Sequence, residues 1–129
     1  MNSKQKIMVV DDDEMSRQLM EAMLTPRGYD VITAENGEAG IALAVREKPA
    51  LILLDVMMPV VDGYTALSMI KNDPAIKDIP VIMVTALGFE LNKKLADRLG
   101  AVGYITKPVG LAELLKQVVR FLPRVREKP

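Results

Sequence analysis

Residues 51–63 read Leu-Ile-Leu-Leu-Asp-Val-Met-Met-Pro-Val-Val-Asp-Gly, and this stretch decides the fold. Leu51 to Leu54 form a run of large apolar residues that ends at the carboxylate of Asp55. A run without polar alternation is typical of a strand that is covered on both faces, as in a parallel sheet. Asp55 then lies where that strand ends, at the rim where open α/β sheets bind their ligands. The rest of the sequence has to explain a charged group at the end of a buried strand.

The alternation of strand and helix recurs along the chain. Apolar and β-branched runs predict strands at residues 7–10, 29–34, 50–54, 81–84 and 103–105. The first helix is expected after Asp13 and before Pro26, and four more are expected at residues 38–47, 63–72, 91–99 and 111–122. These β-α units predict an α/β fold of the flavodoxin-like type. It would be a doubly wound, five-stranded parallel sheet of order 2-1-3-4-5, with five helices on two faces.

Apolar spacing supports the first helix. Met15, Leu19 and Met23 lie four residues apart, as expected for one stripe of a helix. The spacing therefore predicts a helix in this part of the chain.

The composition limits the classes of function. The chain of 129 residues is long enough for one domain, which we expect to span residues 1–129, with its core at about residues 7–122 and a basic tail at residues 123–129. Lys+Arg and Asp+Glu both number 17, which argues against direct nucleic-acid binding. The absence of Cys and His excludes thiolate chemistry and the commonest general base. No apolar run is long enough for a membrane span or a signal peptide, so we expect a cytoplasmic protein.

Polar side chains follow four of the predicted strands. Asp11 and Asp12 follow the first, Asp55 follows the third, Thr85 the fourth and Lys107 the fifth. In the order 2-1-3-4-5, these strand ends share one rim of the sheet. Three clustered carboxylates resist ionisation together, and a divalent cation such as Mg²⁺ relieves their repulsion. A metal, a carboxylate and an opposing cation are the parts of phosphoryl transfer, with Asp55 as the best nucleophile.

Four motifs carry a family resemblance. They are the acidic pair at residues 11–12, the pattern Asp55-x-x-Met58-Pro59-x-x-Asp62-Gly63, the pair Thr85-Ala86 and the run Tyr104-Ile105-Thr106-Lys107-Pro108. In this order and at these spacings the chain resembles the receiver domain of two-component response regulators, including single-domain members such as the bacterial chemotaxis regulator. The resemblance covers residues 7 to about 122, and we expect a stand-alone regulator of this kind.

The resemblance implies the chemistry of the site. Asp55 would be the phosphoacceptor, and the donor would be the phosphohistidine of a sensor histidine kinase or phosphotransfer protein. Mg²⁺ would be held by Asp12, Asp55 and the backbone carbonyl of Met57, with Asp11 acting through water. Lys107 would contact the carboxylate or the phosphoryl group. Such a protein would be a signalling phosphoacceptor that catalyses only its own phosphorylation and dephosphorylation.

The resemblance also implies a switch. Thr85 would turn toward the phosphoryl group, and Tyr104 would move into the space that it leaves. This would reshape the face made by the fourth helix, the fifth strand and the fifth helix, and so control a downstream protein that the sequence does not name. The protein would be a monomer or a phosphorylation-dependent dimer, and the Lys107–Pro108 peptide would be cis.

The residues around Asp55 divide into further roles. Met57 and Leu87 occupy two positions that vary in this family and tune its kinetics, and neither side chain can orient an attacking water by hydrogen bonding. We therefore expect slow self-dephosphorylation. Pro59 restrains the loop after Asp55, and the pair Asp62-Gly63 begins the next helix as a structural cap.

Three alternatives belong to other functional classes. A haloacid-dehalogenase-like aspartyl phosphatase would want a second acid where Met57 stands, and no cap domain fits in 129 residues. A flavodoxin-like cofactor binder would want a Gly- or hydroxyl-rich loop after the first strand, where residues 11–13 are all Asp. A pseudo-receiver, which binds partners without taking phosphate, is disfavoured by the complete set of site residues.

Overall fold

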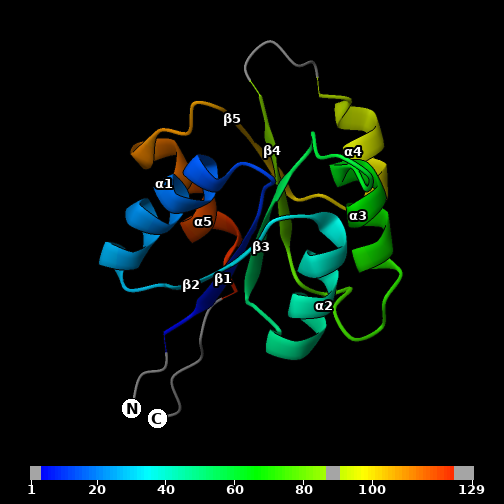
Figure 1. The fold of residues 1–129 in the computed structure, drawn as a ribbon, viewed down its shortest axis with the longest axis horizontal. Helices are drawn as coiled ribbons and strands as arrows, with labels where there is room; N and C mark the ends of the chain where they lie inside the picture. Colours follow the sequence, from blue (N-terminus) through cyan, green and yellow to red (C-terminus); the bar gives the residue numbers. More distant parts are fainter. Residues whose placement is uncertain (1–3, 87–90, 124–129) are drawn as a thin grey trace.

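Five strands and five helices alternate in the computed structural model, which describes residues 4–86 and 91–123 (Figure 1). The strands are β1 (Lys6–Val10), β2 (Asp30–Ala34), β3 (Leu51–Asp55), β4 (Val81–Thr85) and β5 (Gly103–Thr106). The helices are α1 (Glu14–Leu24), α2 (Gly37–Glu47), α3 (Gly63–Lys71), α4 (Lys93–Leu99) and α5 (Leu111–Phe121), with a short 3-10 turn η1 at Thr25–Arg27. None of the helices in these residues is long and apolar enough to cross a membrane.

All strands are parallel and lie in the order β2-β1-β3-β4-β5, which confirms the predicted topology. β3 is the central strand. It pairs with β1 on one side, where Val10 lies opposite Leu54, and with β4 on the other, where Asp55 lies opposite Val84. The carboxyl ends of these three strands therefore meet at one rim.

Two hydrophobic layers cover the sheet, one on each face. Alternate β3 residues enter each layer, with Ile52 and Leu54 in one and Leu51 and Leu53 in the other. The first layer packs under α2, α3 and α4, and the second packs under α1 and α5. Figure 1 shows these two groups of helices on opposite sides of the sheet. This double coverage explains why the sequence of β3 has no polar alternation.

The helix that this apolar spacing predicts is confirmed as α1, although the spaced residues do not form its most buried side. Met15 and Leu19 are 77% and 48% exposed, whereas the buried residues of the helix are Met20 and Leu24. Neighbouring stripes on a helix differ by only about 100° of rotation, so apolar spacing alone does not choose between them. Met23 is partly buried against the same layer.

The fourth helix also begins later than expected. Its first residue is Lys93, because the side chain of Asn92 caps it by accepting a hydrogen bond from the Leu95 N–H at 3.0 Å. The cap expected for α3 is confirmed, since the Asp62 side chain accepts from the Thr65 N–H at 2.8 Å.

Gly63 lets α3 start directly beside the end of β3. A Cβ atom at this position would overlap the Asp55 carbonyl oxygen and lie 2.6 Å from Val56 Cα. The Gly63 N–H donates to the Val56 carbonyl at 2.8 Å, which holds the two segments in contact. No flexible side chain can move aside here, because both neighbours are backbone atoms.

We therefore expect Gly63→Ala to lower the free energy of unfolding by about 2–4 kcal/mol, measured by urea denaturation. Gly110→Ala is the matched control, because a Cβ there meets no heavy atom within 4 Å. Gly110→Ala should lower the free energy of unfolding by less than about 1 kcal/mol, which is the usual effect of changing a helix cap. Equal losses in the two variants would contradict this account of Gly63.

Candidate functional site

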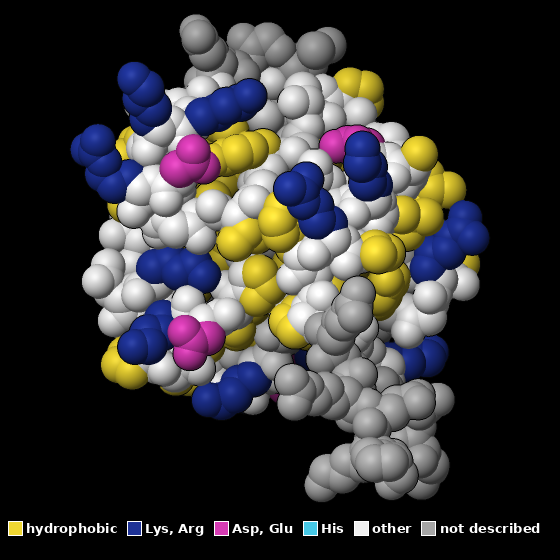
Figure 2. Space-filling view, turned by 180° about the vertical axis from the view of Figure 1, so that it is seen from behind, with side chains coloured by type: hydrophobic (Ala, Val, Ile, Leu, Met, Phe, Trp, Pro, Cys, Tyr) yellow, Lys and Arg dark blue, Asp and Glu magenta, His cyan; other side chains and the backbone are white. Residues whose placement is uncertain are grey.

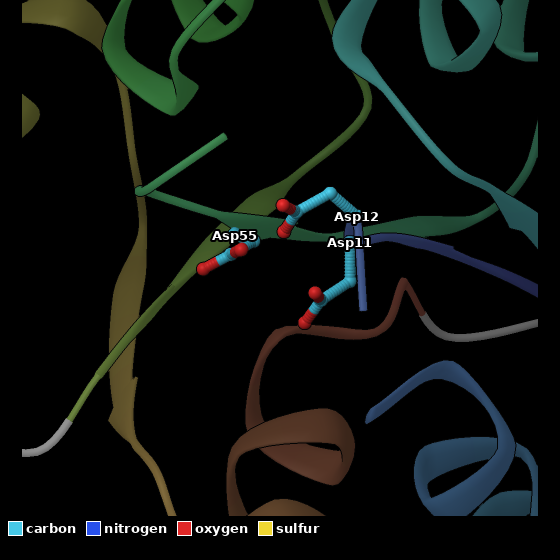
Figure 3. A group of neighbouring side chains, drawn as sticks. All are labelled: Asp11, Asp12 and Asp55. Atoms are coloured by element: carbon cyan, nitrogen blue, oxygen red, sulfur yellow. The ribbon is translucent and has the colours of Figure 1, made fainter. Parts of the chain in front are cut away.

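Three carboxylates meet at the carboxyl ends of β1 and β3. One oxygen from each of Asp11, Asp12 and Asp55 lies within 4.8 Å of the others. Figure 3 shows the three side chains gathered at this end of the sheet. The side chains of Asp11 and Asp55 are buried, at 0% and 3% exposure, whereas Asp12 is exposed. The structure thus brings together the acidic residues that the sequence singled out, with one carboxylate open to solvent.

Lys107 supplies the opposing positive charge. Its Nζ lies 2.7 Å from Oδ2 of Asp11 and 3.8 Å from Oδ1 of Asp55. Its backbone N–H donates to the Thr85 carbonyl at 2.7 Å, which fixes the end of β5 to β4. The Lys107–Pro108 peptide bond is cis, as the resemblance implied. One ammonium group therefore serves two buried carboxylates.

The electrostatics of the site favour a protonated Asp55 in the absence of metal. Burial, and after it the negative charge of Asp11, raise the pKa of Asp55 to about 7 even though Lys107 acts to lower it. Burial acts to lower the pKa of Lys107, but its hydrogen bond and ion pair with Asp11 outweigh this and raise it. A cation beside Asp55 would favour the charged carboxylate and so act against the raised pKa.

Asp11 is fixed in place by contacts with both of its carboxylate oxygens and with its backbone carbonyl. Its Oδ1 accepts from the Asp13 N–H at 2.9 Å, and Oδ2 faces Lys107. The guanidinium of Arg17 donates to the Asp11 backbone carbonyl at 2.7 Å. Arg17 was not expected from the sequence, because a charged residue one turn into a helix carries no signal of such a contact.

The residues expected to switch lie on the two strands that follow β3 in the sheet, Thr85 on β4 and Tyr104 on β5. Thr85 is buried at the last position of β4, and Tyr104 is partly buried on β5. The Tyr104 hydroxyl is buried and has no hydrogen-bond partner among the described residues. Both side chains line one cavity, together with the start of α4.

The loop between β3 and α3 leaves two side chains exposed beside the site. Met57 is 53% exposed, and its backbone N–H hydrogen bonds to Asp55, which lowers the pKa of that carboxyl and only partly offsets burial. Val60 is fully exposed and has a φ of +69°, while the Val61 N–H donates to the Pro59 carbonyl at 2.8 Å, so residues 59–61 form a γ-turn. Leu87, the second position expected to affect dephosphorylation, lies outside the described residues.

Tyr64 joins the start of α3 to the start of α4. Its hydroxyl accepts a hydrogen bond from the Asn92 N–H at 3.1 Å. This contact has no signal in the sequence, because residues 64 and 92 are distant in the chain and a Tyr at position 64 is an ordinary core residue.

Comparison with known proteins assigns the chain to a family. Residues 7–119 match the response regulator receiver domain. The chain belongs to this family. Two-component receiver domains are thus its relatives, and the match gives no support to the phosphatase, cofactor-binding or pseudo-receiver alternatives.

Curated relatives of this receiver domain are longer proteins. It is 41% identical over 123 residues to the probable transcriptional regulator ycf27 of Porphyra purpurea, covering 95% of this chain and 49% of that protein. It is 42% identical over 121 residues to the response regulator PleD of Caulobacter vibrioides, covering 94% of this chain and 26% of PleD. The receiver domain thus spans half or less of the length of these relatives.

Solved structures give the same assignment. A putative response regulator from Chloroflexus aurantiacus superposes with a TM-score of 0.88 at 31% identity, over 95% of this chain and 100% of that one. The receiver domain of the sensor histidine kinase PA1611 from Pseudomonas aeruginosa superposes with a TM-score of 0.83 at 30% identity, over 92% and 98% of the two chains. That structure holds a magnesium ion in its active-site cleft.

The raised pKa of Asp55 makes stability depend on pH. Its value of about 7 in the folded chain lies above the value of about 4 expected when unfolded. Between these values the folded state binds more protons at Asp55, so this group contributes less stability as the pH rises. In EDTA, Asp55→Asn should therefore exceed the wild type by about 1–3 kcal/mol in free energy of unfolding at about pH 8. The extra stability of Asp55→Asn should shrink toward about pH 4, as measured by urea denaturation at a series of pH values. Extra stability that does not change with pH would contradict a raised pKa at Asp55.

Proposed function

We propose that this receiver domain accepts a phosphoryl group on Asp55, in the presence of Mg²⁺, from the phosphohistidine of a sensor histidine kinase or phosphotransfer protein. The observation that carries the proposal is the cluster of Asp11, Asp12 and Asp55 with Lys107 between two of them. These 129 residues contain no His, so the donor imidazole has to come from outside them.

Asp55 is the nucleophile in this reaction. One of its carboxylate oxygens attacks the phosphorus atom, and an O–P bond forms as the N–P bond to the imidazole breaks. The electron pair of the broken bond stays on the imidazole nitrogen. Since Asp55 lies at the end of the stiff central strand, its position changes little during transfer, which favours an in-line approach of the donor.

The acidic cluster fits a hard divalent cation. Carboxylate and carbonyl oxygens are the ligands that Mg²⁺ prefers, and Asp12, Asp55 and the Met57 carbonyl would hold it, with Asp11 acting through water. The bound ion would supply positive charge against the phosphoryl oxygens. The magnesium ion in the cleft of the PA1611 receiver domain supports this assignment.

Lys107 and Thr85 would bind the phosphoryl group once it is attached. Lys107 already lies 3.8 Å from Asp55 and can transfer its contact to a phosphoryl oxygen. Thr85 would donate its hydroxyl from the end of β4, and Tyr104 would move into the space that Thr85 leaves. The new dianion would thereby change the surface of α4, β5 and α5 that a downstream protein contacts.

The direct test is the mass of the intact protein after incubation with Mg²⁺ and acetyl phosphate. We expect a gain of one phosphoryl group, which EDTA prevents and Asp55→Asn abolishes, because this variant lacks the nucleophile. Asp62→Asn is the matched control and should still be labelled, since Asn also caps a helix. A label that persists in Asp55→Asn would contradict the proposal, as would turnover of acetyl phosphate without an adduct or no label at all.

The apolar side chain of Met57 predicts a long-lived phosphoryl group. Met57→Asn would place an amide beside Asp55 that can orient an attacking water, so loss of the label should become about tenfold faster or more. Met69→Asn is the control, because Met69 is similarly exposed but lies on α3. A wild-type phosphoryl half-life of only seconds, measured by intact mass with Mg²⁺, would show that Met57 does not protect the group.

A further inference from the structure

Arg17 is a cation that contacts the acidic cluster without pairing with a carboxylate. Figure 2 shows Lys and Arg side chains spread over one face of the molecule and extending from its surface. Arg17 differs, because it is partly buried and its Nη1 donates to the backbone carbonyl of Asp11 at 2.7 Å. The ion pairs of the described residues involve Lys6, Arg46 and Lys107 but not Arg17. Its contact with the end of β1 is therefore made to the backbone.

The carbonyl that Arg17 binds belongs to the peptide unit that leads to Asp12. A peptide unit is planar, so the Asp11 carbonyl oxygen and the Asp12 Cα atom lie in one rigid plane. The next plane, between Asp12 and Asp13, is held by the Asp13 N–H, which donates to Oδ1 of Asp11 at 2.9 Å. Both planes that meet at the Asp12 Cα are therefore fixed by hydrogen bonds, one from Arg17 and one to Asp11.

Arg17 is itself anchored to this turn. Its backbone N–H donates to the Asp13 carbonyl at 3.1 Å, at the start of α1. The Asp11 N–H donates to the Ala34 carbonyl at 3.1 Å, which ties the same segment to the end of β2. The segment before α1 is thus held by the sheet on one side and by the helix on the other, and the guanidinium of Arg17 connects the helix to the strand end.

Asp12 depends on its backbone for its position. Its side chain is exposed, and none of the hydrogen bonds and ion pairs of the described residues involves it. Asp11 and Asp55 differ, because both are buried and Lys107 lies beside their carboxylates. A ligand that nothing else holds is placed by its Cα, so a freer backbone at Asp12 would lower the affinity of a metal site there.

Two cations near the cluster should therefore act on Mg²⁺ binding in opposite directions. Lys107 lies against the carboxylates, so its charge competes with a metal ion for them. The charge of Arg17 also opposes the ion, but its hydrogen bond orders the backbone of a ligand before the ion binds. A solvated charge changes binding by less than about sixfold, whereas losing a contact that orients a metal ligand typically costs about ten- to a hundredfold. The ordering of Asp12 is thus the larger effect.

We propose that Arg17 is a positioning residue of the magnesium site. Its hydrogen bond to the Asp11 carbonyl fixes the backbone of Asp12, and it thereby strengthens Mg²⁺ binding although its own charge opposes the ion. This inference rests on the proposed function, in which Asp12 binds Mg²⁺ directly. It adds a residue that touches neither the ion nor the phosphoryl group.

The test compares Arg17→Met with the wild type by calorimetric titration with Mg²⁺. Met is a good helix former that has neither charge nor donor. We expect binding to weaken about fivefold or more, whereas loss of the charge alone predicts tighter binding. Arg17→Lys keeps the charge and a donor, and should bind Mg²⁺ more tightly than Arg17→Met does. Arg27→Met is the matched control, because it removes an exposed arginine outside this network and should not weaken binding.

Hydrogen exchange in EDTA, measured by NMR, gives a readout that does not depend on the metal. In Arg17→Met the exchange of the Asp13 amide should accelerate at least about fivefold more than that of the β3 amides, which report global stability. Equal acceleration would show only a general loss of stability and would overturn the proposal. Unchanged or tighter Mg²⁺ binding in Arg17→Met would also overturn it, as would an Arg17→Lys variant that binds no better than Arg17→Met.

The proposed function is tested separately by the phosphoryl label on Asp55. If the label forms and Arg17→Met binds Mg²⁺ as tightly as the wild type does, this inference alone fails. If Arg17→Met weakens Mg²⁺ binding as expected but Asp55 takes no label, the proposed function fails and the role of Arg17 stands.

Discussion

The repulsion among three neighbouring carboxylates is the interaction on which the rest of the site depends. Asp11 and Asp55 are buried, Asp12 is close by, and Lys107 is the cation paired with them among the described residues. One positive charge does not balance three negative ones, and the pKa of Asp55 is raised, first by burial and then by the charge of Asp11. The same imbalance makes the site receptive to a divalent cation, and a bound cation would make Asp55 available as a carboxylate nucleophile.

The parallel sheet holds these charges together against their repulsion. β1, β3 and β4 are covered on both faces, so the rim cannot relax without disturbing the two hydrophobic layers. Close backbone contact at Gly63 anchors the loop that follows Asp55, and Arg17 holds the backbone of Asp11.

Strand order and the convergence of the acidic residues could be predicted from the sequence, because parallel strand ends share a rim and each strand is a distinct apolar run. The buried side of α1 could not be predicted. Met15 and Leu19 are spaced like Met20 and Leu24, so spacing alone does not show which pair faces the sheet. The positive φ of Val60 also has no local signal, because Gly or Asn is the usual residue there. Contacts between distant segments, such as Tyr64 with Asn92, depend on tertiary packing that the pattern of residues does not encode.

A calorimetric titration with Mg²⁺ tests the charge imbalance most directly, using the wild type, Asp12→Asn and Lys107→Ala. Asp12→Asn should weaken binding by about tenfold or more, because it removes the exposed carboxylate of the cluster. Lys107→Ala should tighten it, because the ammonium competes with the metal for the negative charge of Asp11. Weaker Mg²⁺ binding in Lys107→Ala, or unchanged binding in Asp12→Asn, would contradict the account of an acidic rim with uncompensated negative charge.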